Sequence, residues 1–217
     1  MDSKLELDTR PDKLPIAARS EVYRILSGVF VYPASKEQKD FIQQEAPAAL
    51  RVAAAGLPFP IPALRALTEW DAKAVPDIEV EFTRLFDNCT GNPVLSLYEK
   101  DFARIDQKKL WEELVRYYEH FGLRYNLEEC KEWPDHIGIE LEFLHYLTFL
   151  EATVPDAMTK DYVAAEDDFL ERHLAKWVPG FSKKLDADDT PYSMFGQVLA
   201  QFIAGEREFN RQRRLLQ

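Results

Sequence analysis

The stretch from Glu132 to Leu144 constrains the fold of this chain most, because it predicts a helix that must be buried. It reads EWPDHIGIELEFL. Pro134 fixes its own φ angle and disfavours the α conformation at the residue before it, so a helix should begin here with Asp135 as its N-cap. The apolar residues that follow cover more than half of the helix circumference, a pattern typical of a central helix.

Two polar residues of this helix lie within its apolar arc. His136 and Glu140 are four positions apart and therefore share a face. A buried carboxylate needs hydrogen-bond partners or a raised pKa. The pair has two interpretations: a structural His–Glu pair that closes the helix N-terminus, or part of a functional site.

The rest of the chain predicts an all-α fold, a bundle of about eight or nine helices. Hydrophobic residues make up 46% of the sequence, which supports a core, and there are only 8 glycines. Apolar spacing, capping residues and prolines place the helices at 16–31, from 35 toward 47, 48–55, 63–74, 76–86, 110–121, 135–154, 158–177 and from 190 onward. We expect the Pro179-Gly180 pair to interrupt the chain after the helix at 158–177.

The length of 217 residues suits a single domain or two small lobes. We expect a flexible N-terminus at 1–14 and one helical domain at 15–205, whose lobes meet near 123–135. Residues 206–217 form a basic tail with four arginines and two glutamates, expected to be a solvated helix end.

Composition limits the partners and the location. The formal charge is −11, from 27 basic and 38 acidic residues, which argues against nucleic-acid binding and suits a cationic partner. The sequence has neither an apolar signal region at its start nor an apolar run of about 18 residues, so we expect a cytoplasmic protein without a membrane span. Cys89 and Cys130 match no metal or redox motif and are expected to be free thiols.

The stretch EWPDHIGIELEFL resembles the signature of the TorD/DmsD/NarJ family, cytoplasmic chaperones that mature molybdenum-containing redox enzymes. That signature runs Glu-x-Pro-Asp-His, a short gap, then Glu-Leu-x-Phe-Leu. EFTRLFDNCTGNPVLSLYEKDF and FLERHLAKWVPGF are similar to two further family segments. The first departs at Asp87, where glycine often follows Leu-Phe, and at Lys100, where a small residue often follows Tyr-Glu. These departures leave the subfamily and the partner open.

The resemblance implies an all-helical, non-enzymatic chaperone of two lobes with no cofactor of its own. Its partner would be the N-terminal twin-arginine leader, or the apo-catalytic subunit, of a molybdoenzyme, held until the molybdenum cofactor is inserted and before export. The chaperone would be a monomer or a homodimer. Carried over by motif, the peptide-binding site comprises Trp133, Pro134, Asp135 and His136, with Glu140 in support and Tyr98 and Glu99 beside it.

Peptide chemistry fits these residues. Arginine pairs best with carboxylates, which Asp135 and Glu99 would supply. The apolar part of a leader needs a hydrophobic groove, for which Trp133, Tyr98 and Phe86 would form the wall. Core packing is the alternative for each of these aromatic residues, and N-capping is the alternative for Asp135.

Two other functions stay open. Glu142 and His145 form the Glu-x-x-His spacing of di-iron helical bundles, which would make the protein a small helical metalloenzyme, although no second copy of the spacing is present. The Asp-His pair would otherwise only hold two lobes together in a structural protein-interaction module. No phosphate-binding loop or nucleophile elbow is found in the sequence.

Overall fold

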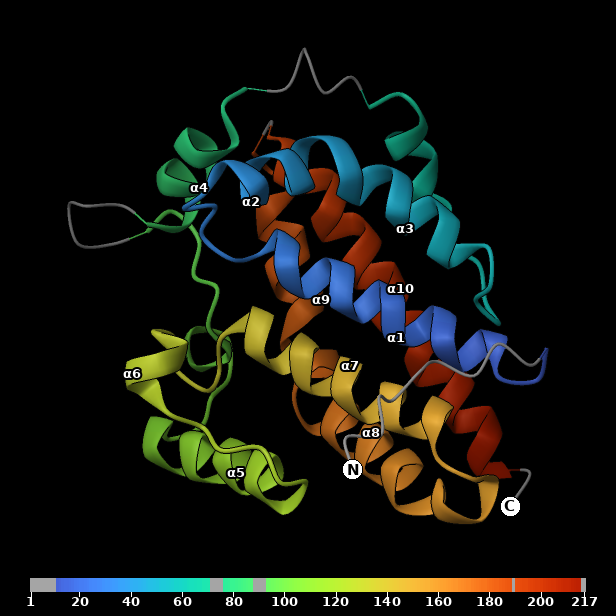
Figure 1. Ribbon diagram of the computed structural model, residues 1–217. Helices are drawn as coiled ribbons and strands as arrows, with labels where there is room; N and C mark the ends of the chain where they lie inside the picture. The colour runs from blue at the N-terminus through green and yellow to red at the C-terminus, as the bar shows by residue number, and fades with distance from the viewer. Residues whose placement is uncertain (1–10, 71–75, 88–92, 189, 216–217) are drawn as a thin grey trace.

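The computed structural model describes residues 11–70, 76–87, 93–188 and 190–215, and most of them are helical (Figure 1). The predicted all-α fold is confirmed. Of the expected flexible segment at 1–14, residues 1–10 lie outside the described residues, as does Cys89, while Lys13 is buried and Leu14 begins the first helix. The elements are α1 (Leu14–Val29), α2 (Lys36–Asp40), the π-helix η1 (Phe41–Glu45), α3 (Ala46–Ala54), the 3₁₀ helix η2 (Pro62–Thr68), α4 (Ile78–Phe86), η3 (Glu99–Asp101), α5 (Gln107–His120), α6 (Leu127–Cys130), α7 (Ile137–Thr153), η4 (Asp156–Met158), α8 (Lys160–Arg172), α9 (Leu174–Leu185) and α10 (Pro191–Leu215).

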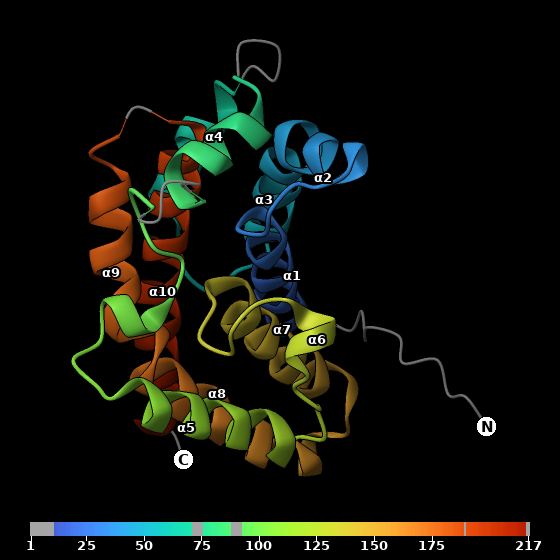
Figure 2. The ribbon, with the colours of Figure 1, turned by 90° about the vertical axis from the view of Figure 1, so that its left-hand side faces the viewer.

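Helices α1 and α7 lie side by side and form the centre of the bundle (Figures 1 and 2). α3 packs on α1, α8 packs on α7, and α10 packs along α9 while reaching α1 and α8. α5 runs beside α8, and α6 lies near the beginning of α7 (Figure 2). None of the helices in the described part of the chain is long and apolar enough to cross a membrane.

Helix α7 is buried as its sequence predicts. Ile137, Leu141 and Leu147 have no exposed surface, while Ile139 and Tyr146 on the other side are half-buried. Burying an aliphatic side chain of this size contributes about 1.5–3 kcal/mol. The apolar arc of α7 therefore accounts for its central place.

The prediction of one helix at 158–177 is wrong, because the helix is interrupted at His173, which separates α8 from α9. His173 has φ −117° and ψ −97°, outside the helical range, and its Nδ1 lies 2.9 Å from Glu99 Oε2. Pro179 does not end a helix but lies inside α9. Because proline has no N–H, α9 lacks the hydrogen bond from residue 179 to the Ala175 carbonyl, and the helix continues without it.

The N-terminal helices differ from their predictions in detail. The capping box of Ser35 and Gln38 is confirmed at the start of α2. Pro47 does not interrupt the helical segment, which is continuous from α2 through η1 to α3. The π-helical turn η1 precedes α3, in which Pro47 occupies the first turn. The helix predicted at 63–74 forms only the 3₁₀ helix η2, and 71–75 lie outside the described residues.

Helix α10 continues through most of the expected basic tail. It runs to Leu215 and buries Glu206 and Asn210. Arg213 forms an ion pair with the buried Glu151, and Arg214 lies 2.6 Å from Asp167. The expected boundary between residues 205 and 206 therefore falls inside a helix that packs on α8 and α9 and pairs with α7 through Arg213.

A buried arginine joins the four long helices. Arg19 of α1 has no exposed surface, and its guanidinium donates to Glu206 of α10 (2.8 and 3.0 Å). It also donates to Glu151 of α7 (3.1 Å) and to Glu166 of α8 (2.7 Å). Tyr23 adds a hydrogen bond of 3.0 Å to Glu206. We call these residues the Arg19 cluster.

The charges of the Arg19 cluster balance only if one carboxyl carries a proton. Arg19 and Arg213 face the three buried carboxyl groups of Glu151, Glu166 and Glu206. Burial raises the pKa of Glu166 to about 8, although the neighbouring Arg19 opposes that shift. A protonated Glu166 at neutral pH leaves two carboxylates for two guanidinium groups.

Replacing Arg19 should destabilise the fold strongly. Arg19→Leu leaves buried carboxylates without their cation, and we expect a loss of about 3–5 kcal/mol in the free energy of unfolding. Arg24→Leu is the matched control, because Arg24 lies on the exposed side of α1 and its ion pair among the described residues is with Glu21. That control should lose less than about 1 kcal/mol. Urea unfolding measures both, and equal losses would contradict the role of Arg19.

The proton on Glu166 should appear in the pH dependence of stability. A carboxyl whose folded pKa is raised stabilises fully below its unfolded pKa, near 4.5, and this contribution is lost as pH rises through about 8. Glu166→Gln keeps the shape without the titration. Wild type should therefore lose stability relative to the variant between those pH values, by at most about 1.4 kcal/mol per pH unit. Urea unfolding over a pH series measures the difference. If the free energies of unfolding of both proteins changed with pH in the same way, the proton would not lie on Glu166.

Candidate functional site

Two short backbone segments bring the predicted site together. Residues 97–99 run antiparallel to residues 135–137, with an isolated bridge between Tyr98 and His136. Glu99 N donates to Asp135 O (3.0 Å), and Ile137 N donates to Leu97 O (2.9 Å). The loop before η3 is thereby fixed against the beginning of α7.

Asp135 is not the N-cap of α7, contrary to prediction. Its side chain is fully buried and accepts two hydrogen bonds, from Trp111 Nε1 (2.6 Å) and from the backbone N–H of Lys100 (3.0 Å). Burial raises the pKa of Asp135, and those two donors oppose the shift. Because both oxygens are engaged inside the protein, Asp135 links α5, η3 and α7.

His136 caps α7 instead. Its Nδ1 accepts from Gly138 N (3.1 Å), and a Cβ at position 138 would lie only 3.2 Å from that nitrogen, so glycine fits the cap. Burial lowers the pKa of His136 to about 4, which leaves the ring neutral at pH 7 with its proton on Nε2. The ring meets Tyr98 edge to face at 5.2 Å.

The expected His136–Glu140 pair does not form, because each residue has another partner. Glu140 is fully buried and accepts from Trp177 Nε1 of α9 (3.1 Å), while its Oε1 has no partner among the described residues. Burial and the neighbouring Glu99 carboxylate raise the pKa of Glu140 well above its usual range. Glu99 in turn contacts His173. Through these buried contacts, Glu140 connects α7 to α9, and Glu99 connects η3 to His173 at the start of α9.

The exposed part of the site is aromatic. Trp133 is 39% exposed and stacks on Trp111, with ring centroids 4.2 Å apart and planes 12° apart. Both indoles line a groove of about 880 Å³ together with Val115, Tyr125 and Pro134. We call it the tryptophan groove. It offers an apolar floor with a polar rim, as peptide-binding grooves do.

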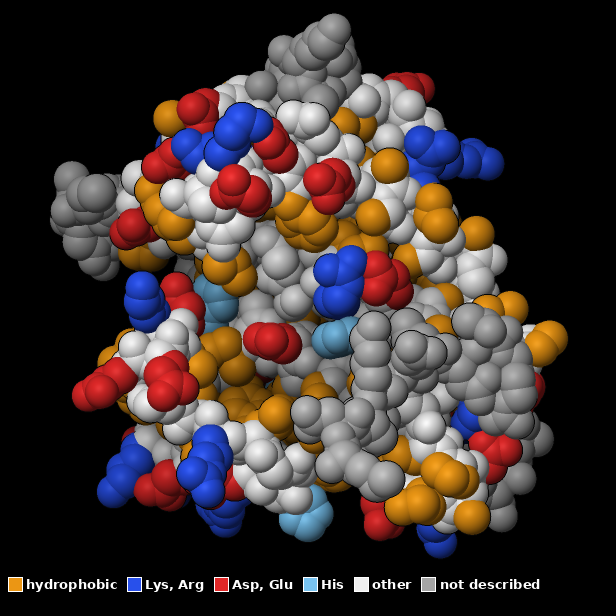
Figure 3. Space-filling model, viewed as in Figure 1, with side chains coloured by type: hydrophobic (Ala, Val, Ile, Leu, Met, Phe, Trp, Pro, Cys, Tyr) orange, Lys and Arg blue, Asp and Glu red, His pale blue; other side chains and the backbone are white. Residues whose placement is uncertain are grey.

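A second apolar hollow lies beside the exposed side of α7, where Figure 3 shows hydrophobic side chains at the bottom of a depression. Its volume is about 420 Å³, and Ile139, Phe143, Tyr146 and Phe149 line it. The two hollows share Tyr125. The two hollows therefore adjoin at Tyr125, beside the start of α7.

Phe86 lies apart from this surface. It is 8% exposed and packs in the core against Phe82 (5.0 Å) and Tyr192 (5.2 Å). The structure brings the other seven predicted site residues together at the start of α7. Core packing accounts for Phe86, because α4 directs it toward α10 instead of toward the exposed loop.

Glu142 and His145 do not converge with other metal ligands. Glu142 is exposed, and His145 Nδ1 lies 2.9 Å from both the hydroxyl and the carbonyl oxygen of Ser20. Within the described parts of the chain, no three His, Cys, Asp or Glu side chains are placed to hold a metal ion.

Sequence reasoning missed Trp111, Tyr118, His173 and Trp177 as residues of the site. Tyr118 donates to the Pro134 carbonyl (2.8 Å), and the other three contact the carboxyl groups described above. His173 and Trp177 belong to FLERHLAKWVPGF, so the third similar segment carried their signal. Trp111 had only a helical apolar spacing, which gives no indication of a hydrogen bond to Asp135.

The chain belongs to the family described as nitrate reductase delta subunit, whose model matches residues 38–183. This confirms the family inferred from the sequence motifs.

Named relatives agree with this membership. The chain is 35% identical over 133 residues to the selenate reductase assembly chaperone protein of Thauera selenatis, covering 60% of this chain and 68% of the relative. It is 36% identical to the chlorate reductase assembly chaperone protein of Ideonella dechloratans, with the same coverage. The chaperone protein TorD of Vibrio atlanticus is 27% identical over 59% of this chain and 60% of its own.

A solved structure supports the fold. A candidate redox enzyme maturation protein from Archaeoglobus fulgidus superposes with a TM-score of 0.55 at 22% identity, covering 85% of this chain and 93% of the other. At that identity the likeness bears on the architecture alone.

Asp135→Ala should destabilise the protein as well as disturb its surface. The change leaves the Trp111 indole N–H and the Lys100 amide without an acceptor, and we expect a loss of about 2–4 kcal/mol. Asp106→Ala is the comparison, because Asp106 is an exposed N-cap of α5 that accepts only from Lys109 N. It should cost about 1 kcal/mol. Thermal unfolding of both variants checks the order, and an undisturbed Asp135→Ala protein would contradict it.

Proposed function

We propose that this protein is a cytoplasmic chaperone for assembly of a molybdenum-containing oxidoreductase. It binds the N-terminal leader or the apo-catalytic subunit before cofactor insertion and export. The match to the nitrate reductase delta subunit family supports the chaperone role, as do relatives named for the assembly of selenate, chlorate and perchlorate reductases.

The observation that carries the peptide-binding role is the exposed indole stack over an apolar groove. Trp133 and Trp111 present large, rigid surfaces, the kind of residue that dominates binding at protein interfaces. An apolar leader segment gains free energy by covering them. In this proposal Trp133 and Tyr98 contact the client, and Asp135, His136, Glu99 and Glu140 position them from below.

This division of roles revises the expected arginine contacts. Asp135 and Glu99 are buried, at 0% and 3% exposure, and already accept hydrogen bonds or pair inside the protein. A guanidinium from a leader would have to displace these partners to reach them. We propose that the two carboxyl groups hold the groove in shape and that the chaperone performs no catalysis.

A structural module is the second candidate, favoured by the burial of Asp135 and His136. In that case the start of α7 would only join the lobes, and the tryptophan groove would bind nothing. An exposed residue separates the two candidates, because its replacement leaves the buried contacts intact.

Trp133→Ala should weaken client binding by about tenfold with little change in melting temperature, because Trp133 is partly exposed. Met158→Ala is the control, since Met158 is 60% exposed on η4, outside the groove. The client is first identified by pull-down from the native cell, and its N-terminal peptide is then titrated by calorimetry. Unchanged affinity of the Trp133→Ala protein would remove the groove from the proposal.

A further inference from the structure

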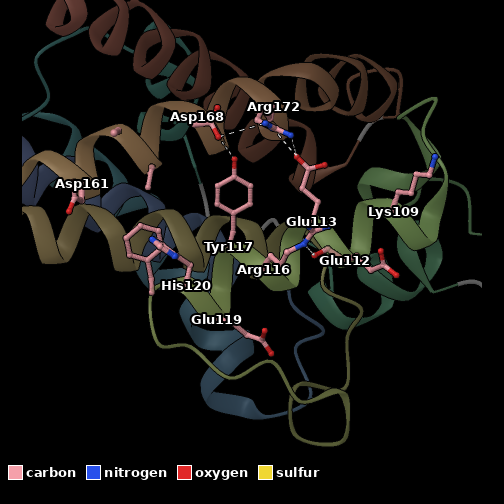
Figure 4. A pocket seen from close by; sticks show the side chains of 13 residues that line it. Lys109, Glu112, Glu113, Arg116, Tyr117, Glu119, His120, Asp161, Asp168 and Arg172 are labelled. Atoms are coloured by element: carbon pink, nitrogen blue, oxygen red, sulfur yellow. Dashed lines mark hydrogen bonds and ion pairs between the residues drawn. The ribbon is translucent and has the colours of Figure 1, made fainter.

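A second groove lies between α5 and α8 (Figure 4). It adjoins the tryptophan groove across α5. Its volume is about 1090 Å³, and we call it the α5–α8 groove. Glu112 and Arg116 line both grooves, so they form the ridge between them. Tyr117 and Phe121 supply apolar surface on the α5 side, and Ala164 and Ala165 supply it on the α8 side.

The α5–α8 groove is acidic. Five carboxylates and three basic side chains line it. Arg172 is already paired, with Glu113 and with Asp168 (4.0 Å). Glu119 and Asp161 have no ion pair or side-chain hydrogen bond among the described contacts. A cation entering from solvent would therefore meet an excess of negative charge in the groove.

Two side-chain contacts cross the groove from α5 to α8. Tyr117 donates its hydroxyl hydrogen bond to the Asp168 carboxylate, and Arg172 Nε donates to Glu113 (2.8 Å), as Figure 4 shows. Beyond them lies a buried acceptor that the protein leaves unused.

That acceptor is His173 Nε2. The His173 side chain is 2% exposed, and Nε2 has no hydrogen-bond partner among the described residues. It lies 3.8 Å from Glu113 Oε1, and Glu113 lines the groove. In the tautomer whose Nδ1 donates to Glu99, Nε2 is an acceptor. A guanidinium that replaces Arg172 on Glu113, with five N–H donors in a planar fork, would donate to this carboxylate and to the nitrogen together.

We propose that the α5–α8 groove binds an arginine of the client leader while the apolar part of the same leader lies in the tryptophan groove. The inference rests on the proposed function and adds where the charge of the leader is recognised. A helix is about 10 Å across, which three or four extended residues can span. Arginines followed closely by an apolar stretch therefore match two grooves that share one ridge.

The experiment compares two peptides with two double variants of the full chain. The probes are a synthetic peptide with two adjacent arginines ahead of an apolar stretch, and its Gln-Gln analogue. Glu119→Gln/Asp161→Asn removes two groove carboxylates that have no partner to lose. Glu45→Gln/Glu69→Gln is the control, because it removes the same charge from exposed positions at η1 and after η2.

We expect the groove variant to bind the Arg-Arg peptide about three- to tenfold more weakly than wild type, and the Gln-Gln peptide equally well. The control variant should match wild type with both peptides. Imidazole nitrogen NMR gives a second readout, in which the Nε2 signal of His173 should shift with the Arg-Arg peptide and not with its analogue.

The outcomes separate the inference from the function. Equal affinity of wild type and groove variant for the Arg-Arg peptide, with an unmoved His173 signal, overturns the inference and leaves the tryptophan groove as the binding site. If the control variant lost as much affinity for the Arg-Arg peptide as the groove variant, the effect would come from net charge alone, and the inference would also be overturned. If wild type bound neither these peptides nor the N-terminal peptide of its client, the proposed function itself would fail.

Discussion

A single buried guanidinium holds the architecture of this protein together. Arg19 reaches Glu151, Glu166 and Glu206 from the centre of α1, so α7, α8 and α10 all meet at one point. Ions buried without such partners would cost several kcal/mol each, and packings that separate these helices are therefore penalised. Such a cluster is weak evidence for high stability, but it favours one arrangement of these four helices over the others. It fixes α7, and the start of α7 carries the surface proposed to bind the client.

The start of α7 repeats this logic with hydrogen bonds. Asp135 takes donors from α5 and from η3, Glu140 takes one from α9, and His136 closes its own helix. None of these side chains has more than 2% of its surface exposed. A polar network of this kind is rigid because breaking any member leaves a buried group unpaired. The network thereby holds the partly exposed Trp133 and Trp111 in one orientation, and in the proposed function this lowers the entropic cost of binding a flexible peptide.

Periodicity predicted the fold because its signal is local. The helices α1, α5, α7 and α10 follow from apolar spacing, and prolines lie within a few residues of the ends of α1, α7 and α10. Sequence could not predict the break at His173, because that break accompanies a contact with Glu99, 74 positions away. Nor could it predict the partners of Arg19, which lie 132 to 187 positions along the chain. Of the site, the Pro-Asp-His motif located five residues, and the segment at 81–102 located Tyr98 and Glu99. These segments could not distinguish buried carboxylates from exposed ones. An aspartate reads the same in the sequence whether it caps a helix at the surface or accepts hydrogen bonds in the core.

The same distinction explains why the sequence can depart from the family pattern at Lys100. The site uses the backbone N–H of this residue, which donates to Asp135 whatever side chain follows. Its ammonium instead lies 5.2 Å from the Tyr98 ring and 5.8 Å from the Trp111 ring, at the edge of the aromatic surface. Asp87, the other departure, is an exposed residue at the end of α4. Positions that contribute only backbone can change their side chains without disturbing the buried network. Client preference can therefore diverge at Lys100, directly beside the groove, while Asp135, His136 and Glu140 stay fixed by their partners.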